Sequence, residues 1–224
     1  MKKYLVKEIF GPTIEGEGSQ AGAPVLFLRL SGCNRWSGKD EDKSTSICHF
    51  CDTDFVGGNR MTSLEIINKL LEIHPDHLYN KEREKIAPYL TKKKLVISGG
   101  EPTLQMDYEL LRALKESNFE IHVETNGSRR IDIKTLTLID HLVMSPKQSI
   151  LETKLGEVDD LKLLYPYLKG ASPKEFRAIR AKNKFIQPVH DFNYRKNLKG
   201  AIQQVIENPD YKLSIQLHKV IKMP

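Results

Sequence analysis

Three cysteines lie close together in the sequence and are candidates for a metal site. Cys33, Cys48 and Cys51 are the only cysteines in the chain, and an odd number argues against a disulfide framework. Three thiolates from one loop can hold three corners of a cubane iron–sulfur cluster and leave the fourth iron open to a small molecule. A zinc site with His49 as fourth ligand is an alternative, although it crowds three ligands into residues 48–51. A third interpretation is that the three cysteines are unrelated buried thiols. The spacing alone does not decide between the cluster, the zinc site and the unrelated thiols.

The composition is that of an ordinary globular protein. The 224 residues suit one domain, 1–224, that carries a long polar loop at 34–47. No apolar run is long enough to span a membrane, and the first residues are too few and too charged for a signal peptide. We therefore expect a cytoplasmic protein with no membrane partner. The net charge of +6 fits a protein that handles anions and equally fits a weak nucleic-acid binder.

The elements that must position the cysteines are strands and helices in alternation. We expect strands at 25–30, 95–97, 120–123, 141–144, 185–186 and 213–217, another near Phe176, and one at 4–10 that pairs with the first. We expect helices at 62–71, 108–116, 133–136, 158–168 and 195–206; residues 75–93 are polar and hard to assign. This alternation predicts an α/β fold with a parallel sheet. About six βα units are too few for a closed eight-stranded barrel, so we expect a partial, open βα barrel.

Residues able to do chemistry recur directly after these strands. They are Cys33 after the first strand, GGEP at 99–102 after the second, ETNG at 124–127 after the third, SPK at 145–147 after the fourth, and Gln187 with Pro188 after a later one. In parallel sheets, active sites gather at the carboxyl ends of the strands. The recurrence therefore predicts a single active site at that edge.

Several motifs resemble those of a known family. Residues 48–51 match the C-x-aromatic-C half of the radical S-adenosylmethionine signature, and 98–102 match the GGEP loop of that superfamily. The gap of fourteen residues at 34–47 is longer than usual. Five further motifs restrict the resemblance to one family within that superfamily. They are FGPTIEGEG at 10–18, RLSGCN at 29–34, CDT at 51–53, ETNG at 124–127 and QLHK at 216–219. Together they resemble the 7-carboxy-7-deazaguanine synthase family, some members of which have this long gap, from residue 8 to about 220.

The resemblance implies a set of cofactor-binding residues. Cys33, Cys48 and Cys51 would hold a [4Fe–4S] cluster whose open iron binds S-adenosyl-L-methionine and cleaves it to a 5′-deoxyadenosyl radical. The residues expected to contact the cofactor are His49, Phe50, Gly99, Gly100, Glu101, Ser145, Pro146, Lys147 and Gln187. Glycines let the backbone approach the methionine moiety, and the Glu101 carboxylate can accept from its ammonium group. The fold implied is the partial barrel of radical S-adenosylmethionine enzymes.

The resemblance also implies a pterin substrate, 6-carboxy-5,6,7,8-tetrahydropterin, and a Mg²⁺ ion bound by the Thr53 hydroxyl. The residues expected to contact the substrate are Ile14, Glu15, Gly16, Arg29, Ser98, His218 from the last strand, and the terminal carboxylate of Pro224. Glu15 stands where the family more often has Gln, and would accept hydrogen bonds from the guanidine-like pterin edge. Arg29 would clamp the substrate carboxylate; a strand-edge salt bridge is its structural alternative.

The implied reaction is ring contraction with loss of ammonia to give 7-carboxy-7-deazaguanine, an intermediate toward queuosine. A homodimer and a flavodoxin-like electron donor come with the resemblance. The alternative functions are a glycyl-radical-enzyme activase, which needs no pterin clamp, and a non-enzymatic, zinc-stabilised nucleic-acid-binding module. Metal analysis separates the module from the enzymes.

Overall fold

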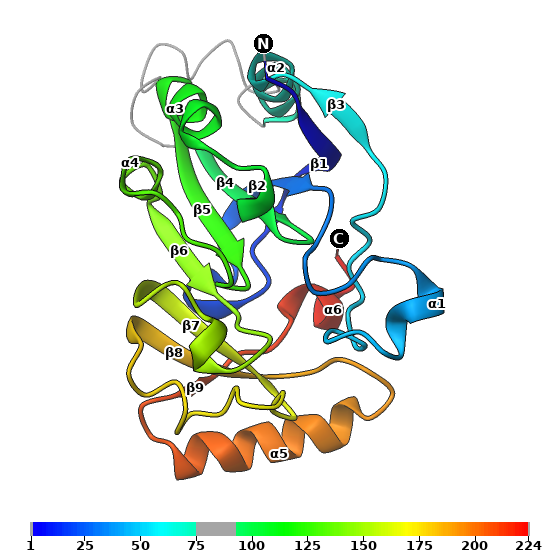
Figure 1. Cartoon of the computed structure of the whole chain (residues 1–224), viewed down its shortest axis with the longest axis vertical. Helices are drawn as coiled ribbons and strands as arrows, with labels where there is room; N and C mark the ends of the chain where they lie inside the picture. Colours follow the sequence, from blue (N-terminus) through cyan, green and yellow to red (C-terminus); the bar gives the residue numbers. More distant parts are fainter. Residues whose placement is uncertain (1, 75–92, 224) are drawn as a thin grey trace.

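One mostly parallel sheet organises the molecule (Figure 1). The computed structural model describes residues 2–74 and 93–223. Within them the strand order is β3-β1-β2-β4-β5-β6-β7-β8-β9. The strands are β1 (Tyr4–Ile14), β2 (Pro24–Leu30), β3 (Asn59–Met61), β4 (Lys93–Gly99), β5 (Phe119–Thr125), β6 (His141–Met144), β7 (Glu157–Tyr165), β8 (Arg180–Pro188) and β9 (Lys212–Leu213). Every neighbouring pair from β2 to β9 is parallel, whereas β1 is antiparallel to both β2 and β3.

The helices are α1 (Asp40–Lys43), α2 (Ser63–Ile73), α3 (Tyr108–Glu116), α4 (Ile133–Leu136), α5 (Tyr194–Glu207) and α6 (Leu217–Ile221). Helix α2 begins at a capping box, in which Thr62 Oγ1 accepts from Glu65 N at 3.3 Å and the Glu65 carboxylate accepts from Thr62 N at 2.7 Å. It packs on β1 and α3, while α5 packs on β8 and β9. No helix in the described ranges is long and apolar enough to cross a membrane.

The two faces of the sheet have different chemistry because successive side chains on a strand point to opposite faces. One face packs the hydrophobic core, with Leu28, Leu95, Ile121, Leu161 and Leu163 almost fully buried. The alternate residues point to the opposite, inner face and are largely polar; they include Ser98, Glu124, Lys162 and Gln187. The inner face is therefore where the sheet can build a reaction site.

The predicted helix at 158–168 is wrong. Residues 158–165 of this segment belong to β7, a parallel neighbour of β6 and β8, and residues 166–168 follow the strand. Asp160 and Lys162 are charged, as residues on the exposed face of a helix are, but they are 1% and 5% exposed and lie on the inner face of the sheet. Their charges are compensated within the protein, so a strand pattern looked like an amphipathic helix.

Two further strand predictions need correction. The expected strand at 213–217 is reduced to Lys212–Leu213, and the chain then forms α6, because its pairing with β8 ends at Leu213. His218 therefore lies on a helix. Phe176 is fully buried in a turn, and β8 begins only at Arg180, from where it runs through the expected strand 185–186. Of the unassigned segment 75–93, residues 75–92 lie outside the described residues, and Lys93 begins β4.

Candidate active site

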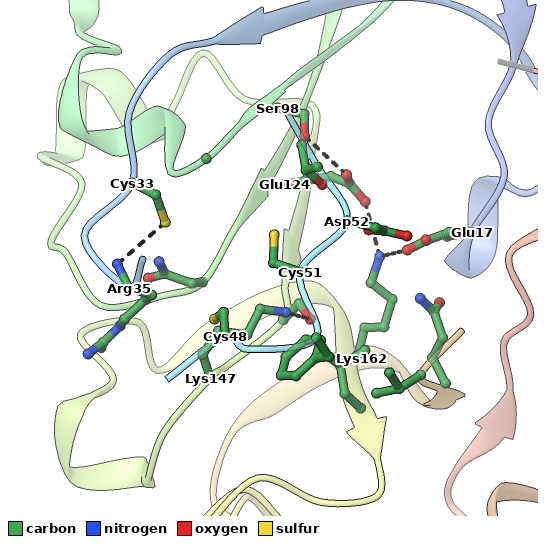
Figure 2. A pocket seen from close by; sticks show the side chains of 18 of the residues that line it. Glu17, Cys33, Arg35, Cys48, Cys51, Asp52, Ser98, Glu124, Lys147 and Lys162 are labelled. Atoms are coloured by element: carbon green, nitrogen blue, oxygen red, sulfur yellow. Dashed lines mark hydrogen bonds and ion pairs between the residues drawn. The ribbon is translucent and has the colours of Figure 1, made fainter. Parts of the chain in front are cut away.

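A cavity of about 200 Å³ opens at the carboxyl ends of the parallel strands (Figure 2). Most of the residues predicted from the sequence line it. They are Cys33, Cys48, Phe50, Cys51, Thr53, Ser98, Gly99, Gly100, Ser145, Lys147 and Gln187. Residues far apart in the chain therefore meet at the predicted edge of the sheet.

The long cysteine loop is held by an aromatic anchor. Trp36 and Phe55 pack edge to face with their ring centroids 5.5 Å apart, in a cluster that also contains Cys48. The Trp36 Nε1 group donates to Lys39 O at 3.0 Å and to Asp42 Oδ1 at 3.1 Å. The loop thus folds back on itself beside the cysteines and carries its own small core.

The three thiols surround a common space. All three line the cavity, and Figure 2 shows their side chains around one part of it. Burial raises the pKa of Cys33 and raises that of Cys48 to about 11. No group of three or more His, Cys, Asp or Glu side chains in the described ranges is placed to hold a single metal ion. Thiols spread around a space fit a cluster of several atoms, which needs sulfur ligands on different sides.

His49 is placed differently from the cysteines on either side of it. It is exposed and packs edge to face against Phe50, and it is absent from the lining of the cavity. The structure therefore does not bring it together with the thiols as a fourth zinc ligand. Pro146 is also buried away from the lining.

Gly100 is fixed by a close approach of two chain segments. A Cβ atom at this position would clash with Gly32 O and lie 2.7 Å from Cys33 Cβ. The neighbouring amides confirm the contact, since Gly100 N donates to Leu30 O at 3.3 Å and Glu101 N donates to Gly32 O at 2.9 Å. The GGEP loop thus sets the position of Cys33.

We expect Gly100→Ala to lower both the stability of the protein and its iron content after reconstitution. The added methyl group must push the Cys33 loop away, an overpacking that costs about 1–3 kcal/mol. Denaturant unfolding of the apoprotein and iron per chain are the measurements. Gly156→Ala is the matched control, because a Cβ there meets nothing within 4 Å. Equal iron content in the two variants would contradict this role.

Glu101 joins two loops instead of facing the cavity. It is completely buried; Oε1 accepts from Thr125 Oγ1 at 2.7 Å and Thr103 Oγ1 at 2.6 Å, and Oε2 accepts from Asn126 N at 2.7 Å. Its carboxylate thereby ties the loop after β4 to the loop after β5. Direct contact between Glu101 and the cofactor stays a prediction.

A buried charged wall closes the other side of the cavity. Lys162 forms ion pairs with Glu17 and with Glu124, the latter at 3.2 Å (Figure 2). Burial alone would raise the pKa of Glu17, but the Lys162 ammonium and hydrogen bonds from Lys162, Gln216 and Gln187 lower it to about 2. The two carboxylates in turn raise the pKa of Lys162 despite its burial. Ser98 Oγ lies 3.5 Å from Glu124 Oε2.

Three residues that line the cavity were not predicted from the sequence: Glu17, Glu124 and Lys162. Two of them stand inside motifs, 10–18 and 124–127, and that position was the available signal. Lys162 gave no signal because its segment was predicted to be helical. Arg35 was also missed; it lines the cavity, and its backbone N donates to Cys33 Sγ at 3.4 Å.

The residues after β6 and β8 occupy the remaining side of the cavity. Lys147 Nζ donates to Ser145 Oγ at 2.7 Å, and burial lowers the pKa of Lys147. Gln187 Oε1 accepts from Ser214 Oγ at 2.9 Å. This side offers a hydroxyl, an ammonium and an amide to a polar ligand.

Several predicted substrate residues lie outside the cavity lining. Arg29 Nε forms an ion pair with Glu8 Oε1 at 2.6 Å, which is the strand-edge salt bridge, and its contact with the substrate stays a prediction. His218 packs against Gly16, where an added Cβ would clash with its ring. Ile14 ends β1, and Glu15 lines a smaller neighbouring cavity. Pro224 lies outside the described residues.

A parallel α/β sheet whose strand ends bring three cysteines and a GGEP loop to one cavity defines the class: a radical S-adenosylmethionine enzyme. No protein-family model matches the chain. The 7-carboxy-7-deazaguanine synthase of Caulobacter vibrioides is 35% identical over 99% of this chain and 99% of its own. That of Burkholderia multivorans is 36% identical over 99% of each. The chain belongs to the 7-carboxy-7-deazaguanine synthase family.

A solved structure agrees with the fold. The crystal structure of QueE from Escherichia coli matches this chain with a TM-score of 0.60, covering 96% of this chain and 95% of that one. The sequence identity is 19%, so this likeness concerns the fold. It confirms the predicted mostly parallel α/β architecture.

Proposed function

We propose that this protein converts 6-carboxy-5,6,7,8-tetrahydropterin to 7-carboxy-7-deazaguanine with loss of ammonia, in queuosine or related 7-deazapurine biosynthesis. The observation that carries the proposal is the meeting of Cys33, Cys48 and Cys51 with the GGEP loop in one cavity. Family membership, from relatives named 7-carboxy-7-deazaguanine synthase, supports the choice of reaction.

The residues present fit the cofactors that this reaction requires. Cys33, Cys48 and Cys51 would hold a [4Fe–4S] cluster, which together with S-adenosyl-L-methionine supplies a carbon-centred radical for hydrogen abstraction. Gly99 and Gly100 leave room for a ligand to approach the backbone closely. Ser145, Lys147 and Gln187, on the opposite wall, offer hydrogen bonds to hydroxyl and carboxylate groups.

The charged wall suits a pterin. A guanidine-like pterin edge presents several N–H donors, and Glu17 and Glu124 present part-buried carboxylate acceptors at the cavity surface. Arg35 lines the cavity on the cysteine side; its Nη1 is paired with Glu152 Oε2 at 3.1 Å. Its buried Nε has no partner among the described residues and is the donor that we assign to the carboxylate of the substrate. Thr53 lines the cavity and is our proposed Mg²⁺ ligand, with substrate oxygens and water completing the octahedron.

We further propose that the parallel strands form the partial barrel of radical S-adenosylmethionine enzymes and that the protein works as a homodimer. A flavodoxin-like protein would supply the electron, and the cytoplasm is the expected location. The support for these points is family membership and the strand order, in which β3 and β9 form the two ends of the sheet.

An anaerobic assay tests the proposed function. Reconstituted protein is incubated with the carboxypterin, S-adenosyl-L-methionine, dithionite and Mg²⁺, and we expect 7-carboxy-7-deazaguanine and ammonia in equal amounts. Cleavage of S-adenosyl-L-methionine without pterin conversion would favour the activase. Colourless protein with one zinc and no iron would favour the nucleic-acid-binding module.

A further inference from the structure

Glu15 lies next to Glu17, Glu124 and Lys162, on a loop that backbone hydrogen bonds hold in place. It is 7% exposed and lines a small second cavity on the inner face of the sheet. The loop is fixed by Glu15 N donating to Ala23 O and Gly22 N donating to Glu15 O, each at 2.8 Å. The side chain is held as well, since its Oε1 accepts from Glu17 N at 3.1 Å. Glu15 therefore must keep its place among its charged neighbours.

Those neighbours leave Glu15 without a cation of its own. Glu15 is buried, and beside it lie the part-buried carboxyl groups of Glu17 and Glu124, whose side chains are 14% and 27% exposed. The single ammonium among the three is that of Lys162. Lys162 is committed to Glu17 and Glu124 through its ion pairs. If all four groups were ionised, this region would hold two uncompensated negative charges out of water. Buried charges without partners are costly, and such a group takes up a proton instead.

The remaining titratable groups around the second cavity do not supply the missing charge. They are His122 on β5, His141 on β6, Asp160 on β7 and, beside Gly16, His218 on α6. Lys94 on β4 lies next to this cavity, where its Nζ donates to Gln20 Oε1 at 3.0 Å and lies 3.9 Å from Glu120 Oε1. Burial lowers the pKa of both His122 and His218, which keeps them neutral at neutral pH. Asp160 is satisfied by Ser19 N at 2.8 Å, Asn183 Nδ2 at 3.0 Å and His141 Nε2 at 3.4 Å. Lys147, which lines the main cavity and not the second one, donates to Ser145 Oγ at 2.7 Å.

We propose that Glu15 is protonated at neutral pH and that this neutral carboxyl sets the charge of the wall facing the anionic substrate. With the proton in place the four-group cluster carries one net negative charge, and without it two. Burial, with the charges of Glu124 and Glu17, raises the pKa of Glu15 to about 8. As the pH rises through this value, a second negative charge appears beside the carboxylate-bearing substrate, and binding weakens. Glu15 is thus a positioning residue; its effect on substrate rests on the proposed function.

The protonation state is measured first, on the wild-type protein without substrate. The side-chain carboxyl carbons are labelled by growth on [δ-¹³C]glutamate, and their chemical shifts are followed by NMR between pH 4 and pH 10. We expect one glutamate to titrate near pH 8, and its signal to be missing in Glu15→Gln. The proposal is overturned if every glutamate titrates in the ordinary acid range, or if the signal near pH 8 persists in that variant. This result does not depend on the identity of the substrate.

The effect on binding is measured second, by the ratio of the KM for the carboxypterin at pH 9 to that at pH 7. With a pKa of about 8, the protonated fraction falls about tenfold over this interval, so the wild-type ratio is expected to be about 10. The amide of Glu15→Gln cannot ionise. In this variant the ratio of the two KM values is expected to reflect only the ionisation of the substrate itself. A ratio of about 10 in both proteins would overturn the link to binding. If the carboxypterin is no substrate at all, the proposed function fails while the NMR titration still decides the protonation.

Discussion

Replacing any one of the three cysteines with serine is expected to abolish turnover of the carboxypterin, the largest loss of activity that the structure predicts. The variants are Cys33→Ser, Cys48→Ser and Cys51→Ser. Serine keeps the size of the side chain but replaces a thiolate with a hydroxyl, a far weaker iron ligand. Loss of any one cysteine leaves only two thiolates around the cavity. The cluster is then held by too few ligands to stay assembled at the place where S-adenosyl-L-methionine must bind.

Three measurements test this prediction. They are the iron and sulfide content per chain, the visible absorption of the reconstituted protein, and the anaerobic assay. Ser44→Ala is the control, because Ser44 is exposed in the same loop and none of its side-chain atoms has a described hydrogen bond. It should keep both cluster and activity. If one cysteine variant retains a complete cluster and normal turnover, that cysteine is not a ligand. Stoichiometric zinc that is lost with the same substitutions would point to the zinc-stabilised module.

The position of the site was predictable because the sequence motifs that mark it are short and local. Each chemical motif follows a strand within a few residues, and parallel strands deliver their carboxyl ends to one edge. Cys33, Gly100 and Ser145 therefore came together as expected. The alternation of apolar segments also located β2, β4, β5 and β6 and helices α2, α3 and α5 within a few residues.

The charged wall was not predictable because its signals are not local. Lys162 and Glu17 are separated by most of the chain and meet only through the sheet order. A buried lysine whose charge is compensated inside the protein looks like an exposed one in the sequence, which is also why β7 was predicted as a helix. The ion pair of Arg29 is not a local feature either: its partner, Glu8, is set by the register of β1 against β2, where the two residues lie opposite each other. Contact between Arg29 and the substrate stays a prediction.

Lys162→Met is expected to cause the largest loss of stability on the inner face of the sheet. The substitution keeps most of the apolar side chain but leaves Glu17 and Glu124 without their common cation. Removing one partner of a buried ion pair costs about 3–5 kcal/mol of unfolding free energy, because the remaining charge stays desolvated. Denaturant unfolding of the apoprotein at neutral pH measures the loss. The double variant Lys162→Met with Glu17→Gln should recover part of it, since one stranded carboxylate is then gone.

The matched control is Lys182→Met, which removes an ion pair with Asp159 at 2.6 Å from a lysine whose side chain is 78% exposed. Exposed pairs contribute about 0–1 kcal/mol, so this variant should unfold almost like the wild type. The pH dependence gives a second check. The pKa of Glu17 is lowered from 4.5 to about 2, so its stabilising ion pair is fully present above pH 4.5 and is lost as the pH falls through 2. The difference between wild type and Lys162→Met should therefore be largest at neutral pH and shrink in acid. An equal effect of the two lysine substitutions, or a difference that grows in acid, would show that Lys162 does not compensate the buried carboxylates.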